Sequence, residues 1–137
     1  MTVSFFKTTH TIPDSLGIVL DCDEGRIVYT GDFKFDQTAT DGYATDFGRL
    51  AQIGTKKVIA LLSDSANAEN FERPSNETEI AASIAEIIKY HEGRVVVASV
   101  ASNILRIQQV IDAAVQSGRK VVLTGHDLEK SLIRRLN

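Results

Sequence analysis

The sequence predicts an α/β fold in which an antiparallel hairpin region precedes a parallel, three-layer α/β unit. Two observations predict it. Before about residue 57 the apolar runs are short and two of them are joined by a tight turn. After that point apolar strands alternate regularly with amphipathic helices. We therefore expect two domains, 1–57 and 58–137.

The first half contains three predicted strands, at residues 3–10, 15–22 and 26–33. The turn DEG joins the last two, and because Gly25 can adopt a positive φ there, we expect antiparallel pairing. Residues 44–54 follow with Phe47, Leu50 and Ile53 at helical spacing, and the run stops on Gly54. This pattern predicts a short helix that bridges the two halves.

The second half predicts an alternation of strands and helices, at residues 57–64, 76–91, 94–100, 103–117 and 120–125. Asn76 and Glu79 form a candidate capping box for the first helix, and Ser102 and Gly118 are candidate ends of the second. The apolar faces expected to point inward comprise Ile80, Ile84, Ile87, Ile88, Ile104, Ile107, Ile111 and Ala114. Unbroken apolar strands separated by helices are typical of a parallel sheet covered on both faces.

Composition limits the classes of function. The chain has 137 residues, 43% of them hydrophobic and 24% charged, and a formal charge of −3, which disfavours a basic domain that coats nucleic acid. A single cysteine, Cys22, rules out an internal disulfide and fits a reducing compartment. Apolar runs are too short to span a bilayer, and no signal-peptide pattern opens the sequence. We expect a cytoplasmic protein without membrane contact.

Polar loops follow the predicted strands of the second half. Hydroxyls and backbone amides there could hold phosphate oxygens, because helix N-termini present unpaired N–H groups at the carboxyl ends of parallel strands. The alternative interpretation is that these side chains only cap helices and satisfy turns, and composition alone favours it. The phosphate-binding candidates are Ser63, Ser65, Ser99, Ser102, Asn103 and Arg106.

His10 and Asp32 form a second candidate site. A lone histidine near a strand end is usually structural, and an aspartate in TGDF usually ends a strand. Together, however, a neutral imidazole and a carboxylate are suitable ligands for Zn²⁺. A hydrolytic metal centre requires three or more protein ligands and a water, so this pair alone is incomplete.

Four segments, TTHTIPDSLGIVL, GRIVYTGDFKFD, ALLSDSANAE and ASVASNILRIQQV, resemble the bacterial ribonuclease J family in order and spacing. That family belongs to the metallo-β-lactamase superfamily and carries a β-CASP insertion. The resemblance implies that residues 1–57 are the end of the first metallo-β-lactamase segment and that residues 58–137 begin the β-CASP domain. It also implies an RNA substrate and an enzyme with endo- or 5′ exoribonuclease activity.

The resemblance assigns roles to three residues. His10 corresponds to a histidine that binds one ion of a two-zinc centre, and Asp32 to the aspartate that bridges both ions. Asp64 corresponds to the catalytic acidic residue of the first β-CASP motif. In the family the two ions polarise the RNA phosphate and generate the attacking hydroxide.

Several features depart from the family pattern. The His-x-His-x-Asp-His ligand motif should precede His10, and further histidines should follow Asn137. Ala66 stands where threonine is usual, and Leu105 and His126 stand where histidine and arginine are common, which argues against RNA contacts at the last two positions. We therefore expect an internal fragment that binds zinc weakly and does not cleave RNA in isolation.

Two other functions stay open on sequence grounds. The second half could bind a phosphate or nucleotide by itself, or the chain could be a non-catalytic fragment that pairs with the full-length enzyme. A truncated sheet would also expose strand edges and apolar faces, so we expect a homo-oligomer.

Overall fold

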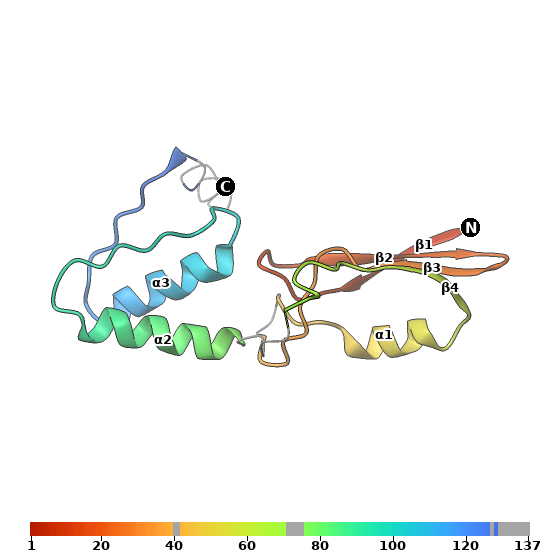
Figure 1. The fold of residues 1–137 in the computed structure, drawn as a ribbon, viewed down its shortest axis with the longest axis horizontal. Helices are drawn as coiled ribbons and strands as arrows, with labels where there is room; N and C mark the ends of the chain where they lie inside the picture. The colour runs from red at the N-terminus through yellow and green to blue at the C-terminus, as the bar shows by residue number, and fades with distance from the viewer. Residues whose placement is uncertain (40–41, 71–75, 127, 129–137) are drawn as a thin grey trace. The chain divides into compact units, whose positions relative to one another are not determined.

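The computed structural model describes residues 1–39, 42–70, 76–126 and 128, and the chain forms two compact units, Met1–Asn76 and Glu77–Asn137 (Figure 1). The described residues form one four-stranded sheet and three helices. The predicted α/β class is therefore confirmed. None of the helices in these ranges is long and apolar enough to cross a membrane.

The sheet of the first unit has the order β1-β2-β3-β4. Its strands are β1 (Thr2–Lys7), β2 (Leu16–Cys22), β3 (Gly25–Tyr29) and β4 (Val58–Leu62). The predicted antiparallel pairing of the first three strands is confirmed, and Gly25 has a positive φ at the β2–β3 turn. β4 pairs with β3 in parallel, so it joins the hairpin strands. The compact units consequently do not divide between residues 57 and 58, and a family domain boundary at that point stays a prediction.

Helix α1 (Phe47–Gly54) covers one face of this sheet. Asp46 caps its N-terminus by accepting the N–H of Arg49. The helix ends at Gly54 as predicted. The C-cap residue Thr55 has right-handed helical φ and ψ, so this helix end does not use a glycine in the left-handed conformation. The buried core beneath the helix consists of Phe6, Val19, Val28 and Ile53, with Leu50 packed against it.

A buried arginine connects the sheet to α1. Arg26 donates from Nε and Nη2 to the two carboxylate oxygens of Asp21 at 2.8 and 3.1 Å, and from Nη1 to the carbonyl oxygen of Ile53 at 2.8 Å. The hydrogen bond from Arg26 lowers the pKa of Asp21 below its usual value of 3.8. The arginine thus satisfies a carbonyl at the end of α1 that no helical N–H reaches.

The second unit is a pair of helices, α2 (Glu77–Tyr90) and α3 (Ile104–Gln116). Its core consists of Ile88, Ala113 and Ala114, with Ile84, Ala85, Val95 and Val110 around it. Ile87, predicted to face inward, is 59% exposed, so that prediction was wrong. Asn103 rather than Ser102 caps α3, whereas Gly118, with φ +66°, follows its end as predicted.

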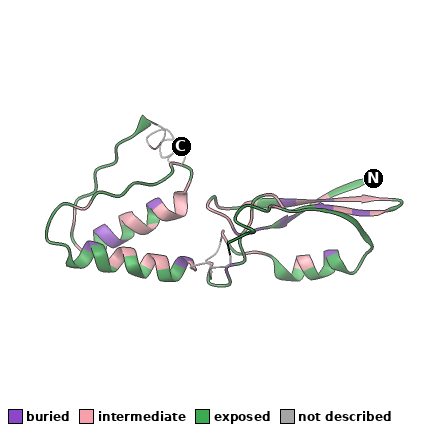
Figure 2. Cartoon of the chain, viewed as in Figure 1, coloured by how far each residue is buried: buried purple, intermediate pink, exposed green. Residues whose placement is uncertain are grey.

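The predicted strands at residues 94–100 and 120–125 do not form. Both segments belong to the second unit and are largely exposed (Figure 2). A strand is stabilised by hydrogen bonds to a neighbouring strand, and no described residue supplies them to either segment. The expected parallel three-layer unit is therefore present only as its helices and two unpaired extended segments.

Candidate functional site

Three strands of the first unit end at the same edge of the sheet. β1 and β3 run in the same direction because each is antiparallel to β2, and β4 is parallel to β3. His10, Asp32 and Asp64 follow these three strands within a few residues. The topology therefore places all three predicted site residues at one edge.

His10 and Asp32 lie side by side. The distance from Nε2 of His10 to Oδ2 of Asp32 is 4.0 Å, and the two side chains are 27% and 73% exposed. Nδ1 of His10 lies 3.4 Å from the hydroxyl of Thr11. Zinc ligands at about 2.0–2.2 Å from a tetrahedral ion are separated by roughly 3.4 Å, so the 4.0 Å separation is close to that of two ligands of one ion.

The backbone on both sides of the pair is held in place. Lys34 donates its N–H to the carbonyl of Thr9 at 2.7 Å, which joins the segment after β1 to the segment after β3. The buried Thr9 is anchored in turn by Thr45, whose hydroxyl accepts the Thr9 N–H at 3.0 Å. Gly31 has φ +63°, and a Cβ there would lie 3.1 Å from the carbonyl oxygen of Leu16. The turn that brings Asp32 to His10 thus requires glycine.

Asp64 is held at the end of β4 by the neighbouring strand. Its N–H donates to the hydroxyl of Thr30 at 3.0 Å, and Thr30 donates its own N–H to the carbonyl of Leu62. One carboxylate oxygen of Asp64 accepts the N–H of Ala66 at 2.8 Å, an Asx turn. Among the described residues no three histidine, cysteine or carboxylate side chains cluster closely enough to hold a metal ion. The donor set compatible with zinc is limited here to His10 and Asp32.

The predicted phosphate-binding serines are divided between the two units. Ser63 and Ser65 follow β4, whereas Ser99, Ser102 and Asn103 lie before α3. The hydroxyls of Ser63 and Ser99 donate to the carbonyls of the residues that follow them. Asn103 Oδ1 accepts the N–H of Arg106 at 3.1 Å. Local turn and cap contacts therefore account for three of the five side chains.

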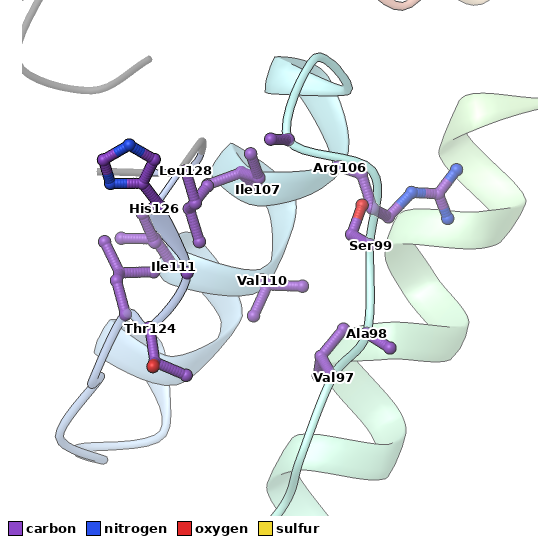
Figure 3. A pocket seen from close by; sticks show the side chains of 13 residues that line it. Val97, Ala98, Ser99, Arg106, Ile107, Val110, Ile111, Thr124, His126 and Leu128 are labelled. Carbon is purple, nitrogen blue, oxygen red and sulfur yellow. The ribbon is translucent and has the colours of Figure 1, made fainter. Parts of the chain in front are cut away.

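Arg106 is paired within the second unit. Its Nη2 lies 3.2 Å from Oε2 of Glu77, with the two side chains 20% and 9% exposed. Figure 3 shows the guanidinium directed toward α2 and away from the cavity beside it. Gln109 donates to both the carbonyl and the carboxylate of Glu77 at 3.3 Å. Sequence patterns do not reveal this cluster, because its members are about thirty residues apart.

Part of the second unit is similar to a known protein domain. Residues 92–135 match the family model described as the β-CASP domain of ribonuclease J. Across most of the chain, curated relatives named ribonuclease J match as well. Ribonuclease J 2 of Streptococcus pyogenes serotype M3 is 58% identical over 93% of this chain, and Ribonuclease J2 of Bacillus subtilis strain 168 is 48% identical over 95%.

Ribonuclease J 1 of the same Streptococcus strain is 47% identical over 97% of the chain. Over most of its length the chain is therefore similar to one segment of ribonuclease J proteins. It spans 23–24% of the length of these three relatives. The resemblance seen in the sequence is thereby confirmed.

Proposed function

We propose that this chain contributes part of the catalytic centre of a ribonuclease J-like RNA hydrolase. The observation that supports the proposal is the placement of His10, Asp32 and Asp64 at one edge of the sheet, with His10 and Asp32 4.0 Å apart. We infer the RNA substrate from the similarity to ribonuclease J. His10 would bind a zinc ion, Asp32 would provide a carboxylate to the same centre, and Asp64 would support it from the adjacent strand end.

Zinc at this position would supply a Lewis acid for the phosphate and lower the pKa of a bound water. The residues of this chain hold and orient the ligands. Nε2 of His10, which lies 4.0 Å from Oδ2 of Asp32, is the ring nitrogen that would bind the ion, and the Thr11 hydroxyl lies 3.4 Å from the other ring nitrogen. The neutral imidazole with a free Nε2 lone pair is the form that binds an ion.

We infer that the chain alone does not hydrolyse RNA, because two ligands leave a catalytic zinc site short of the three protein groups it needs. The test is incubation of the purified 137-residue protein with 5′-monophosphorylated RNA and added Zn²⁺ or Mn²⁺. The expected result is no cleavage above that of metal alone. Metal-dependent cleavage abolished by Asp32→Asn would refute the inference of inactivity and support the catalytic assignment.

We also propose a cytoplasmic location, RNA as the partner of the intact family enzyme, and self-association of this chain. The single cysteine supports the location. Self-association is supported by apolar side chains exposed on the strands of the first unit, among them Val3, Phe5, Tyr29 and Leu62. The alternative of a nucleotide-binding module has weaker support, because Arg106 is paired with Glu77.

A further inference from the structure

Three phenylalanine rings form a group at the sheet edge where His10 and Asp32 lie. Phe33 and Phe35 follow Asp32, and Phe47 is the first residue of α1. The ring centroids of Phe33 and Phe35 are 5.0 Å apart in an edge-to-face arrangement, and those of Phe35 and Phe47 are 6.0 Å apart and stacked. We call these three residues the aromatic group.

The aromatic group is more exposed than its residue type predicts. Phe35 is 67% exposed and Phe47 is 44% exposed, whereas Phe6 in the core beneath α1 is 4% exposed. Large aromatic side chains usually bury most of their surface. The contacts with the other two rings thus leave most of Phe35 open to solvent.

Hydrogen bonds fix the aromatic group beside His10. The N–H of Lys34, which lies between the first two rings in sequence, donates to the carbonyl of Thr9 at 2.7 Å. The hydroxyl of Thr45, two residues before the ring on α1, accepts the N–H of Thr9 at 3.0 Å. Thr9 immediately precedes His10, so one buried residue holds both parts of the group next to a proposed metal ligand.

The exposed ring of Phe35 lies on an anchored segment. The next residue, Asp36, is 8% exposed, and its carboxylate accepts the N–H and the hydroxyl of Thr38 at 2.8 and 2.7 Å. Asp32 precedes Phe35 by three residues, which separates their Cα atoms by at most about 11 Å. The ring is therefore within reach of nucleotides next to a phosphate held at the proposed metal ligands.

The chemistry of the group fits an unpaired nucleobase. Every base has an aromatic face that stacks on a phenylalanine ring, and proteins that bind single strands present such rings beside positive charge. Lys34 is exposed and supplies a positive charge in the same segment. Bases in a duplex are covered by the neighbouring base pairs, so such a surface selects single strands. The group contains no aliphatic side chain, which favours a flat aromatic ligand over a peptide.

We propose that the aromatic group stacks on an unpaired base of the RNA substrate and places the adjoining phosphate at His10 and Asp32. Phe35 contacts the base, and Phe33 and Phe47 hold its ring in place. This inference rests on the proposed nuclease function, from which the RNA is taken. It adds a base-binding surface and a requirement for single-stranded RNA at this edge of the sheet.

Tryptophan fluorescence tests the contact, because the chain contains no tryptophan. The Phe35→Trp variant of the 137-residue protein carries a single fluorophore at the proposed contact. With EDTA present, a single-stranded RNA of about ten nucleotides should quench most of its emission in a saturable manner. A duplex of the same sequence should quench far less. Phe5→Trp, at a position 54% exposed on β1, is the matched control and should keep its emission.

Affinity provides a second measurement. Phe35→Ala should bind a fluorescein-labelled form of the same RNA about tenfold more weakly than the unaltered chain, because one stacked base is lost. Phe35→Tyr keeps the ring and should bind as the unaltered chain does, as should Phe5→Ala. Amide exchange within α1 shows whether each variant is folded.

Several results would overturn the proposal. Equal affinity of Phe35→Ala and the unaltered chain would do so, as would equal quenching by single strand and duplex. The same holds if RNA does not bind at millimolar concentration. A change in Phe35→Trp emission that grows with protein concentration in the absence of RNA would show that a second copy covers the group, and would also overturn it.

Failure of the base contact is distinguishable from failure of the metal centre. If Phe35→Ala keeps its RNA affinity while zinc binding depends on His10 and Asp32, the base contact is wrong and the metal centre stands. If Phe35→Ala loses RNA affinity while His10→Ala leaves zinc binding unchanged, the metal centre is wrong and the base contact stands.

Discussion

The short distance between His10 and Asp32 depends on neighbouring residues that are not themselves proposed metal ligands. Thr9 is anchored by Thr45 and Lys34, and Gly31 supplies the turn that an L-residue would strain. The pair is therefore positioned before any ion arrives. Preorganisation of this kind reduces the cost of binding, although two ligands still make a weak site.

Zinc binding by the isolated chain should be weak and should depend on both residues. Four-ligand zinc sites provide about 10–16 kcal/mol, so two ligands should give a dissociation constant on the order of 10–100 µM. His10→Ala and Asp32→Ala should each weaken binding about tenfold. Competition with a chromophoric chelator measures the constant. Asp14→Ala, in the same loop, should leave it unchanged, and equal losses in all three variants would exclude a specific site.

The ion pair between Asp21 and Arg26 should make the stability of the folded state depend on pH in the acidic range. The pKa of Asp21 in the folded state lies below its usual value of 3.8. At pH values above 3.8 the ionised carboxylate therefore stabilises the folded state. This contribution is lost as pH falls through the lowered folded pKa. Between about pH 5 and pH 2, the Tm of Asp21→Asn should therefore fall less steeply than that of the unaltered chain. Asp23→Asn, in the exposed β2–β3 turn, should follow the unaltered profile.

At the scale of elements, α2 and α3 are joined by polar as well as apolar contacts. Glu77, the first residue of α2, accepts hydrogen bonds from Arg106 and Gln109 of α3. Nε of Arg106 and Oε1 of Gln109 are buried without a partner among the described residues. Removing the carboxylate would leave more donors unsatisfied, which is costly in a partly buried position.

Glu77→Ala should therefore destabilise the helix pair by about 2 kcal/mol. Amide exchange of α2 and α3 measures this directly, because the two units need not unfold together. Glu86→Ala, on the exposed side of α2, should change it by less than about 0.5 kcal/mol. If the two variants behaved alike, the cluster would contribute nothing specific to helix packing.

At the scale of the whole molecule, exposed apolar side chains on the sheet of the first unit predict self-association. Phe5 is 54% exposed on β1, an edge strand of that sheet. Sedimentation velocity should show a dimer or larger species at micromolar concentration, and Phe5→Lys should shift it toward monomer. A monomer at every concentration would contradict this prediction.

Much of the molecule was predictable because periodicity is a local property. Alternating and helical apolar patterns located β1 to β4 and the three helices of the described residues, and the ligand chemistry of His10 and Asp32 predicted that the two side chains lie together. The α3 cap illustrates the limit of such patterns, since Ser102 and Asn103 are equally suitable by type. Backbone geometry selects Asn103, whose side chain reaches the N–H of Arg106.

The sequence by itself determined which segments are extended, which are helical and which residues follow the strand ends, because these depend on neighbours along the chain. Only the tertiary structure decided that β4 pairs with β3 and that Arg106 pairs with Glu77. It also decided that residues 94–100 and 120–125 find no partner strand among the residues that the structure describes. The physical reason is that hydrogen-bond and ionic partners come from segments distant in sequence. A strand-forming pattern therefore becomes a strand only where another segment lies alongside it.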